Sequence, residues 1–426
     1  MARGALLLAA PAGVTLASGC RSEGAKPLAP IFQNWIVSLH PDIEAVNDDF
    51  RSSTALAPVV APPGGVDVAD FVKEAKHRTS TWDTYVGMTP WVDMARLVAK
   101  RVIQPWDRYV AADVVADLVP RVRAEASFDD RLYSWPFLID VVVQGWNGEL
   151  VERAGLDPMR PVATWDEYLA GARAVVDAGV APYGCTFDPR GWRSLVPIAH
   201  SFGDELVTED GLFDFVHPAT VEALEIMKRM VELSHPDVLD PEAVLASISP
   251  DEAMFAAQTV AYYVKYQNAH VRFASGWPDP TRLRLAPLPA GDGPGGTVFW
   301  STGVTLLRHG RNKRDAAAYA NALTHDERIW RQSMGKGRDA AGQLPAFTTL
   351  PGWDEPTRPW MDAWVPAVTA AMRAATPIRP HALGEEQFKV SRPEWEAYLR
   401  GSEPSAHRAL ARAMAKVRKA AEKVSG

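Results

Sequence analysis

The stretch of sequence that decides the fold is YSWPFLID (133–140), continued by GWN (145–147), LVERAGLD (150–157) and TWDEY (164–168). Residues 132–136 have the composition of a short β-strand. Thr164, followed three residues later by Glu167, forms a capping box that predicts the start of a helix. Apolar residues recur at helical spacing over 165–176, and Gly179 ends the helix. The stretch therefore predicts a strand followed by a capped helix.

The same alternation extends along the chain in both directions. Further strands are predicted at 31–37, 83–87, 259–264 and 283–288, and further helices at 68–76, from Pro218 and from Ser402. Strands that alternate with helices indicate α/β layers. A chain of 426 residues is too long for one compact core, since single cores stop growing near about 250–300 residues. We therefore expect an α/β protein with two lobes.

The composition excludes several classes of protein. Hydrophobic residues make up 47% of the chain and charged residues 23%, which is ordinary for a globular protein and excludes a disordered or fibrous one. The net charge is −7 and no long basic run occurs, so no nucleic-acid partner is expected.

The N-terminus has the pattern of an export signal. Arg3 precedes an apolar stretch at 4–16, and small residues then lead to Cys20 in a sequence that resembles the bacterial lipobox. We expect a signal peptide at 1–19, lipidation of Cys20, and a lipidated tether at 20–30 that holds the body at the outer face of the cell membrane or in the periplasm. A plain secretory signal is the alternative.

The cysteine content agrees with lipidation. The chain has two cysteines, Cys20 and Cys185. If Cys20 carries lipid, Cys185 has no disulfide partner, whereas exported proteins usually use cysteines in pairs. Cys185 lies in an apolar run, which predicts a buried, unreactive thiol.

Motifs for cofactor or metal chemistry do not emerge from the sequence. GDGPGG at 291–296 matches a dinucleotide-binding glycine pattern, but a predicted strand follows it where that motif needs a helix, so we interpret it as a loop. The ten histidines are not spaced as metal ligands. We therefore expect no cofactor and no metal. Carboxylates are abundant, so a glycosidase pair stays open.

Tryptophans are placed where a ligand site is expected. Trp35, Trp91, Trp192 and Trp300 lie at predicted strand ends or in the loops just after them, which is where open α/β sheets bind ligands. An indole stacks on the C–H face of a sugar ring, whose hydroxyls need partners such as Asp, Asn, Arg or Lys. As a set they predict a sugar site, with core packing as the alternative for each ring taken alone.

Taken in order, these motifs resemble the extracellular solute-binding proteins of ABC importers, of the carbohydrate-binding type (family 1). Beyond the stretch at 133–168, the resemblance is carried by FAAQTVA (255–261), APLP (286–289), residues 312–320, QLPA (343–346) and residues 399–410. It implies a two-lobed periplasmic-binding-protein-like fold with discontinuous lobes, hinge strands and a ligand cleft between the lobes.

The resemblance also implies lobe boundaries. One lobe is expected to comprise 31–139 plus 286–325, and the other 140–285 plus 326–426. Hinge strands are expected to cross at 137–141, at 283–289 and between 322 and 345.

Site residues are implied in the same way. Asp140 falls where relatives place a cleft carboxylate at the first crossing. The other ligand-binding residues that we expect are Trp35, Thr89, Trp91, Asp188, Trp192, Lys265, Tyr266, Trp300, Ser301 and Arg338. Gly145 and Trp146 stand where relatives have two tyrosines, so the identity of the sugar cannot be transferred.

The function implied is that of a monomeric receptor, not an enzyme, that captures a sugar or oligosaccharide and delivers it to an ABC permease in the membrane. Ligand binding is expected to close the lobes. Two alternatives stay open: an exported carbohydrate-active enzyme that uses the Trp-lined cleft, and the same fold binding a polyol, a phosphorylated compound or an amino compound.

Overall fold

The computed structural model describes residues 26–203, 205–240, 248–290, 295–333, 341–350 and 364–425. The expected signal peptide, Cys20 and Arg338 lie outside the described residues. Among the described residues, Leu28 is the first that is fully buried, and its backbone N–H donates to the carbonyl of Ala55 at 2.8 Å. This residue lies two positions before Pro30, the expected end of the tether.

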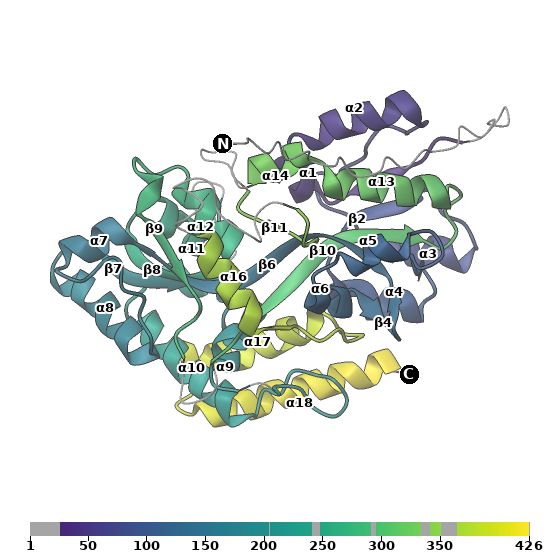
Figure 1. Ribbon diagram of the computed structural model, residues 1–426. Coiled ribbons are helices and arrows are strands. Elements are labelled where there is room, and N and C mark those ends of the chain that lie inside the picture. Colours follow the sequence, from purple (N-terminus) through teal and green to yellow (C-terminus); the bar gives the residue numbers. More distant parts are fainter. Residues whose placement is uncertain are drawn as a thin grey trace, which may run out of the picture.

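Within the described residues, ten strands form one open sheet whose main path runs β1–β2–β10–β6–β8–β7 (Figure 1). The strands on this path are β1 (Pro30–Phe32), β2 (Thr84–Met88), β10 (Thr297–Leu307), β6 (Ser134–Asn147), β8 (Val260–Tyr266) and β7 (Tyr183–Phe187). Off the path lie β3 (Ile103–Gln104), β9 (Leu283–Ala286), β11 (Leu344–Pro345) and β12 (Ala375–Pro377). A separate hairpin joins β4 (Ser127–Phe128) and β5 (Arg131–Leu132).

Strand β6 joins the two halves of this sheet. Its first half, up to Val141, pairs antiparallel with β10, and from Val142 onward it pairs antiparallel with β8 and β9. All 14 residues of β6 are buried. The change of partner falls at the end of the crossing expected at 137–141, and it divides the molecule into two lobes on one shared strand.

Helices cover both faces of each half of the sheet (Figure 1). The first lobe carries α1 (Asn34–Leu39), α2 (Ile43–Ser53), α3 (Val68–Lys76), α4 (Ala95–Ala99), α5 (Ala112–Ala116), α6 (Pro120–Glu125), α13 (Lys313–His325) and α14 (Glu327–Ser333). The second lobe carries α7 (Gly148–Arg153), α8 (Trp165–Asp177), α9 (Leu195–His200), α10 (Pro218–Val231), α11 (Pro250–Ala256), α12 (Gln267–Ala274), α17 (Glu386–Leu399) and α18 (Ala406–Ser425). Helix α16 (Val365–Ala374) packs on β6, β9 and β10, at the junction of the lobes.

The capping box predicted at the start of α8 is confirmed. The Thr164 hydroxyl accepts from the backbone N–H of Glu167 at 3.2 Å, and the Glu167 carboxylate accepts from the backbone N–H of Ala163 at 2.8 Å. Gly179 follows the helix with φ +64°, a conformation that glycine adopts without strain. These three residues fix the ends of α8 through local contacts alone.

The expected boundary between the lobes at 326 is wrong. Trp330 of α14 packs edge-on against Phe137, with 5.6 Å between ring centroids, and Arg328 pairs with Asp49 of α2 at 2.7 Å. Phe347 packs against Trp135 at 5.5 Å. These contacts place 326–333 and 341–350 on the first lobe, because their aromatic side chains are buried there. A change of lobe by residue 345 is therefore not observed in the described residues up to 350.

Cys185 of β7 is fully buried, as predicted. Its thiol contacts the Ser234 hydroxyl at 3.8 Å, and burial raises the pKa of the thiol to about 12. The thiolate, which is the reactive form, is therefore strongly disfavoured.

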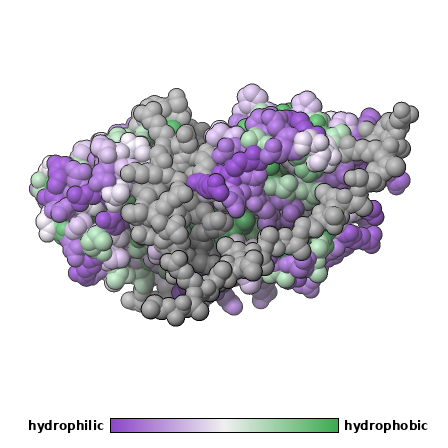
Figure 2. Space-filling view, turned by 45° about the horizontal axis from the view of Figure 1, so that its top comes forward, coloured by the Kyte–Doolittle hydropathy of each residue, from purple (hydrophilic) through white to green (hydrophobic). Residues whose placement is uncertain are grey.

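On the face shown in Figure 2, hydrophilic residues predominate over both lobes, and hydrophobic ones form only small patches. None of the helices in the described part of the chain has the length and apolar character that a membrane span requires.

Candidate functional site

A cavity of about 400 Å³ lies where the two lobes meet. It is lined by Trp35, Leu39, Thr89, Trp91, Val92, Asp140, Trp192, Arg193, Tyr266, Asn268, Arg272, Trp300, Thr302 and Glu385. The volume lies toward the lower end of the range of about 300–1,000 Å³ that is typical of ligand pockets. Seven of the residues expected from the sequence are brought together here: Trp35, Thr89, Trp91, Asp140, Trp192, Tyr266 and Trp300.

Aromatic rings from both lobes form one wall of the cavity. Trp91 lies on the π-helical turn Pro90–Met94 after β2, and Trp192 lies on the 3₁₀ turn Gly191–Arg193 after β7. Their ring centroids are 5.1 Å apart. Trp300 of β10 lies 5.0 Å from Trp192 and 5.6 Å from Tyr266 of β8. The rings therefore meet across the lobe boundary in tilted and edge-on contacts, which favour aromatic pairing.

Two of the tryptophans lie on elements other than those expected. The predicted strand at 31–37 stops at Phe32, and Trp35 lies on helix α1. Asn34 accounts for this change, because its side-chain oxygen accepts from the backbone N–H of Trp35 at 2.8 Å, a local bond that competes with strand pairing. Trp300 lies inside β10, opposite Asp140 of β6, and not in a loop.

Asp140 lies on β6 next to the point where this strand changes partner, and its carboxylate is surrounded by amides. Oδ1 accepts from Asn268 Nδ2 at 2.6 Å and from Gln267 Nε2 at 3.2 Å, and Oδ2 accepts from Gln343 Nε2 at 3.3 Å. Burial raises the pKa of this carboxyl to about 6, although the amides and the more distant Arg193 and Arg272 oppose that rise. Its charge is therefore sensitive to pH near neutrality.

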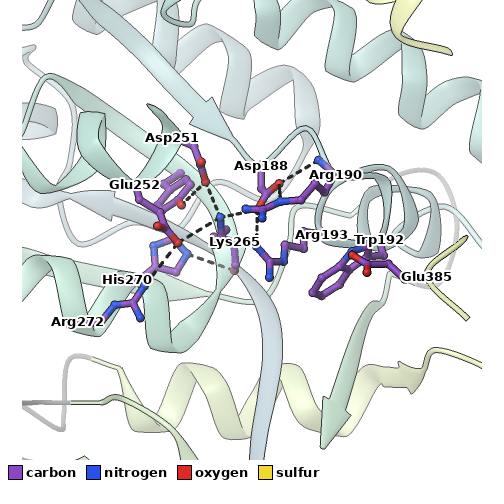
Figure 3. A network of polar contacts seen from close by, with 11 residues as sticks. Asp188, Arg190, Trp192, Arg193, Asp251, Glu252, Lys265, His270, Arg272 and Glu385 are labelled. Carbon is purple, nitrogen blue, oxygen red and sulfur yellow. Dashed lines mark hydrogen bonds and ion pairs between the residues drawn. The ribbon is translucent and has the colours of Figure 1, made fainter. Parts of the chain in front are cut away.

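Asp188 and Lys265 do not line the cavity, contrary to expectation. Both are fully buried, and Lys265 Nζ lies 2.6 Å from Asp188 Oδ2 and 2.5 Å from Asp251 Oδ2 (Figure 3). Arg190 and Arg193 also reach Asp188, at 2.7 and 2.9 Å. Because two carboxylates already surround the ammonium group, Lys265 has a structural role in the second lobe.

The ion pairs around Asp188 and Lys265 form a buried charge network. In it, the pKa of Asp188 shifts in the opposite direction from that of Asp140. Burial would raise the pKa of Asp188, but Lys265, Arg190 and Arg193 hold it well below its usual range. Arg193 extends from the network toward the cavity, with its guanidinium carbon 4.2 Å from the centroid of the Trp192 ring and 5.2 Å from that of Tyr266. The network thus positions one cavity-lining cation between two aromatic rings.

Three further residues were expected to bind the ligand: Thr89, Ser301 and Arg338. Thr89 lines the cavity and its hydroxyl lies 3.3 Å from that of Thr302. Ser301 does not line the cavity, since adjacent strand residues point to opposite faces. Its backbone N–H donates to both carboxylate oxygens of Glu125 at 3.0 Å. Burial raises the pKa of Glu125 to about 8. Arg338 is outside the described residues.

The two departures from the family pattern in β6 have a structural reason. A Cβ at Gly145 would meet His270 Nδ1 at 2.4 Å, so a larger residue does not fit. Trp146 is buried, and its indole N–H donates to the carbonyl of Pro158 at 3.0 Å. Neither residue lines the cavity.

Sequence reasoning missed half of the lining: Leu39, Val92, Arg193, Asn268, Arg272, Thr302 and Glu385. Arg193, Asn268 and Thr302 lie within two residues of expected positions, so a wider window around each strand end would have found them. Arg272 lies one helical turn further along α12 from Asn268. Glu385 comes from the turn before α17 and has no local signal. No group of three or more potential metal ligands occurs among the described residues.

The shared strand, the two α/β lobes and the cavity between them define a two-lobed binding protein of the periplasmic type. Its family follows from the sequence: residues 59–351 match the family model described as bacterial extracellular solute-binding protein, and the chain belongs to that family. Such proteins act outside the cytoplasm as binding proteins. No curated protein matches the sequence.

Solved structures share this fold. The maltose-bound MalE3 of T. maritima is similar over 92% of this chain and 98% of its own, with a TM-score of 0.73 and 14% identity. The GacH receptor of Streptomyces glaucescens, solved with acarbose, is similar over 92% of this chain and 97% of its own, with a TM-score of 0.71 and 20% identity. Lmo0181 of Listeria monocytogenes, in complex with cycloalternan, is similar over 93% of this chain and 99% of its own, with a TM-score of 0.73 and 18% identity. At these identities the likeness concerns the fold.

Proposed function

We propose that this protein captures a sugar or short oligosaccharide in the cavity between its lobes and delivers it to an ABC permease. The observation that carries the proposal is the wall of aromatic side chains, contributed by both lobes, in a cavity that is otherwise lined largely by polar side chains. Indole faces suit the C–H faces of a pyranose, and the polar groups suit its hydroxyls. The similar structures with maltose, acarbose and cycloalternan support the same class of ligand.

Contacts across the lobe boundary support a closing motion. Trp91 and Phe388, at 5.8 Å, and Trp91 and Trp192, at 5.1 Å, join the first lobe to the second. The side chain of Gln267 bonds β6 on either side of Asp140, through the backbone of Ile139 and Val141. A ligand held by both lobes stabilises the closed state by its differential affinity for that state. A permease that recognises the closed shape then distinguishes loaded from empty receptor.

The test is a panel of maltose, maltotriose, glucose and sorbitol, screened by thermal shift and then by calorimetry. A ligand at a hundredfold excess over its Kd stabilises the fold by about 2.7 kcal/mol. Trp192→Leu should weaken the best ligand by about 1–3 kcal/mol, as for other truncated binding residues. Trp277→Leu is the matched control, since Trp277 packs on Phe255 in the core of the second lobe. It should lower the melting temperature and leave the Kd of the folded protein unchanged.

The outcomes separate the hypotheses. Equal losses of affinity in the two variants, or no binding by any member of the panel, would contradict a sugar site at Trp192. Binding of sorbitol alone would favour the polyol alternative. Asp140 and Glu385 both line the cavity, so product formation from the oligosaccharide would favour a carbohydrate-active enzyme instead.

The proposal includes a lipid anchor at Cys20, supported by the export signal; Leu28 is the first fully buried residue among those that the structure describes. A tether of about seven residues extends at most about 25 Å, which keeps the body close to the membrane. Mass spectrometry of the chain extracted from membranes should show Cys20 as an acylated N-terminus. An unmodified N-terminus at any other residue would overturn the anchor.

A further inference from the structure

We infer that the side chains of Trp192 and Glu385 form a partition that limits the length of the bound sugar, and that Glu385 determines this specificity. The inference rests on the proposed function and narrows the ligand from sugars and oligosaccharides in general to one or two sugar rings. It depends on a second cavity behind the pair, on the contacts that hold the pair in place, and on the volume that the pair leaves to the ligand.

A second cavity, of about 220 Å³, adjoins one wall of the ligand cavity. Its lining comes from residues 190–192, after β7, and from the start of α17, and it includes Phe388 and Lys389. Trp192 and Glu385 are the two described residues that line both cavities. Their side chains therefore form the wall between the two spaces.

Local contacts keep this partition closed. The indole N–H of Trp192 donates to Glu385 Oε1 at 3.3 Å, and Figure 3 shows the two side chains side by side. Glu385 Oε2 pairs with Lys389 Nζ at 3.1 Å, one turn further along the chain. The backbone carbonyl of Glu385 accepts from the N–H groups of Phe388 and Lys389, at 3.0 and 3.2 Å. Both the backbone and the carboxylate of Glu385 are thus held in position beside the indole.

The first lobe supports the turn that carries Glu385. Gly384 has φ +50°, and a Cβ at this position would overlap the carbonyl group of Val92. The turn before α17 therefore rests on the backbone of the π-helical turn after β2, and glycine permits this close approach. Trp91 and Phe388 pack beside it, with 5.8 Å between their ring centroids. The partition is consequently in place when the two lobes are in contact.

The size of the ligand cavity agrees with a short ligand. Its volume of about 400 Å³ lies toward the lower end of the range for ligand pockets. A further sugar ring on the side of the partition would collide with the indole of Trp192 and the carboxylate of Glu385. Proteins reject wrong ligands through such clashes as well as through contacts that favour the right one. The receptor should therefore bind one or two rings and exclude a third at this wall.

Removal of the Glu385 side chain should open the second cavity to the ligand. It frees the indole N–H of Trp192 and the ammonium group of Lys389, which are donors for the hydroxyl oxygens of a further ring. The side chain of Lys389 is 63% exposed and that of Glu385 is 32% exposed, so their ion pair contributes little to the stability of the fold. We therefore expect the variant to fold like the parent.

The test measures affinity as a function of ligand length. The full chain is titrated by calorimetry with glucose, maltose and maltotriose, and with cellobiose and cellotriose as a second linkage. In the parent, the trisaccharide should bind more weakly than the disaccharide by roughly tenfold or more, as expected for a clash in a closed pocket. In Glu385→Ala this difference should disappear, because the third ring enters the second cavity.

Two further variants separate the volume of the side chain from its charge. Glu385→Gln keeps the volume and an oxygen that accepts from Trp192, so it should preserve the length limit. Glu386→Ala removes a carboxylate from the next residue, which is exposed and lines neither cavity, and it should leave the ratio of affinities unchanged. Melting temperatures show that each variant is folded.

The outcomes distinguish the partition from the proposed function. A parent that binds a trisaccharide as tightly as the disaccharide would overturn the length limit and leave the sugar receptor intact. An unchanged ratio in Glu385→Ala, or the same gain in Glu385→Gln, would overturn the role of Glu385. Failure of every sugar to bind would overturn both the partition and the receptor.

Discussion

Two buried carboxylates, Asp140 in the cavity wall and Asp188 behind Arg193, have opposite electrostatic characters. Asp188 is held by three cations, so its pKa stays well below the usual range despite full burial. Asp140 is held by three amides, and burial raises its pKa to about 6. The comparison teaches that the partners of a carboxylate, more than its burial, decide whether it is a permanent charge. Asp188 stabilises one lobe, whereas Asp140 can change its charge at the strand that joins both.

The largest effect on the stability of the fold is expected from removing the lysine that pairs with Asp188. Lys265→Met leaves Asp188 and Asp251 without their shared ammonium group, and removing one partner from a buried ion pair costs about 3–5 kcal/mol. Urea unfolding followed by circular dichroism measures the loss. Lys73→Met is the control, because Lys73 pairs with Asp70 on the surface and both are largely exposed. Similar midpoints for the two variants would show that the buried network does not stabilise the fold.

Asp140→Asn is expected to change the stability of the fold by a smaller amount and to increase it at neutral pH. A folded-state pKa raised from 3.8 to about 6 adds stability that is fully present below pH 3.8 and is lost as the pH rises through 6. At pH 7.5 this loss amounts to about 3 kcal/mol, at 1.36 kcal/mol per pKa unit. The variant should therefore be more stable than the parent at pH 7.5, by up to this amount, and similar to it near pH 4.

Urea unfolding at the two pH values measures this difference. Asp166→Asn, which alters an exposed carboxylate paired with Arg229, should show no such pH dependence. A variant less stable than the parent at both pH values would mean that the three amides require a charged acceptor, and the comparison with Asp188 would then have to be revised.

Local signals in the sequence predicted much of the fold. The cap at Thr164 and the stop at Gly179 act through neighbours in the chain, so their meaning could be deduced from spacing. The strand predicted at 132–136 is much shorter than β6, which runs from Ser134 to Asn147. In the structure Pro136 lies opposite Gly303, beside a register shift in β10, where the regular ladder is already interrupted. This interruption depends on a strand far away in the sequence.

The candidate site was predicted in part for the same reason. Trp91 and Trp192 follow strands directly, so a rule about strand ends located them. Lys265 follows the strand predicted at 259–264, but it lies within β8, and its pairing with Asp188 and Asp251 is a tertiary contact that spacing does not reveal. Glu385 reaches the cavity from the C-terminal part of the chain, through packing that no local pattern encodes.

The shared strand β6 also constrains how the gene for this protein can change. A one-residue deletion within β6 would turn the side chains on one side of the cut to the opposite face, and all 14 positions of the strand are buried. Neither lobe could absorb the error, since β10 and β8 fix the register on the two sides independently. Insertions and deletions should therefore accumulate in the surface loops of related genes, while the length of β6 stays constant. A designer who fuses a reporter domain into this receptor faces the same restriction on where to cut the chain.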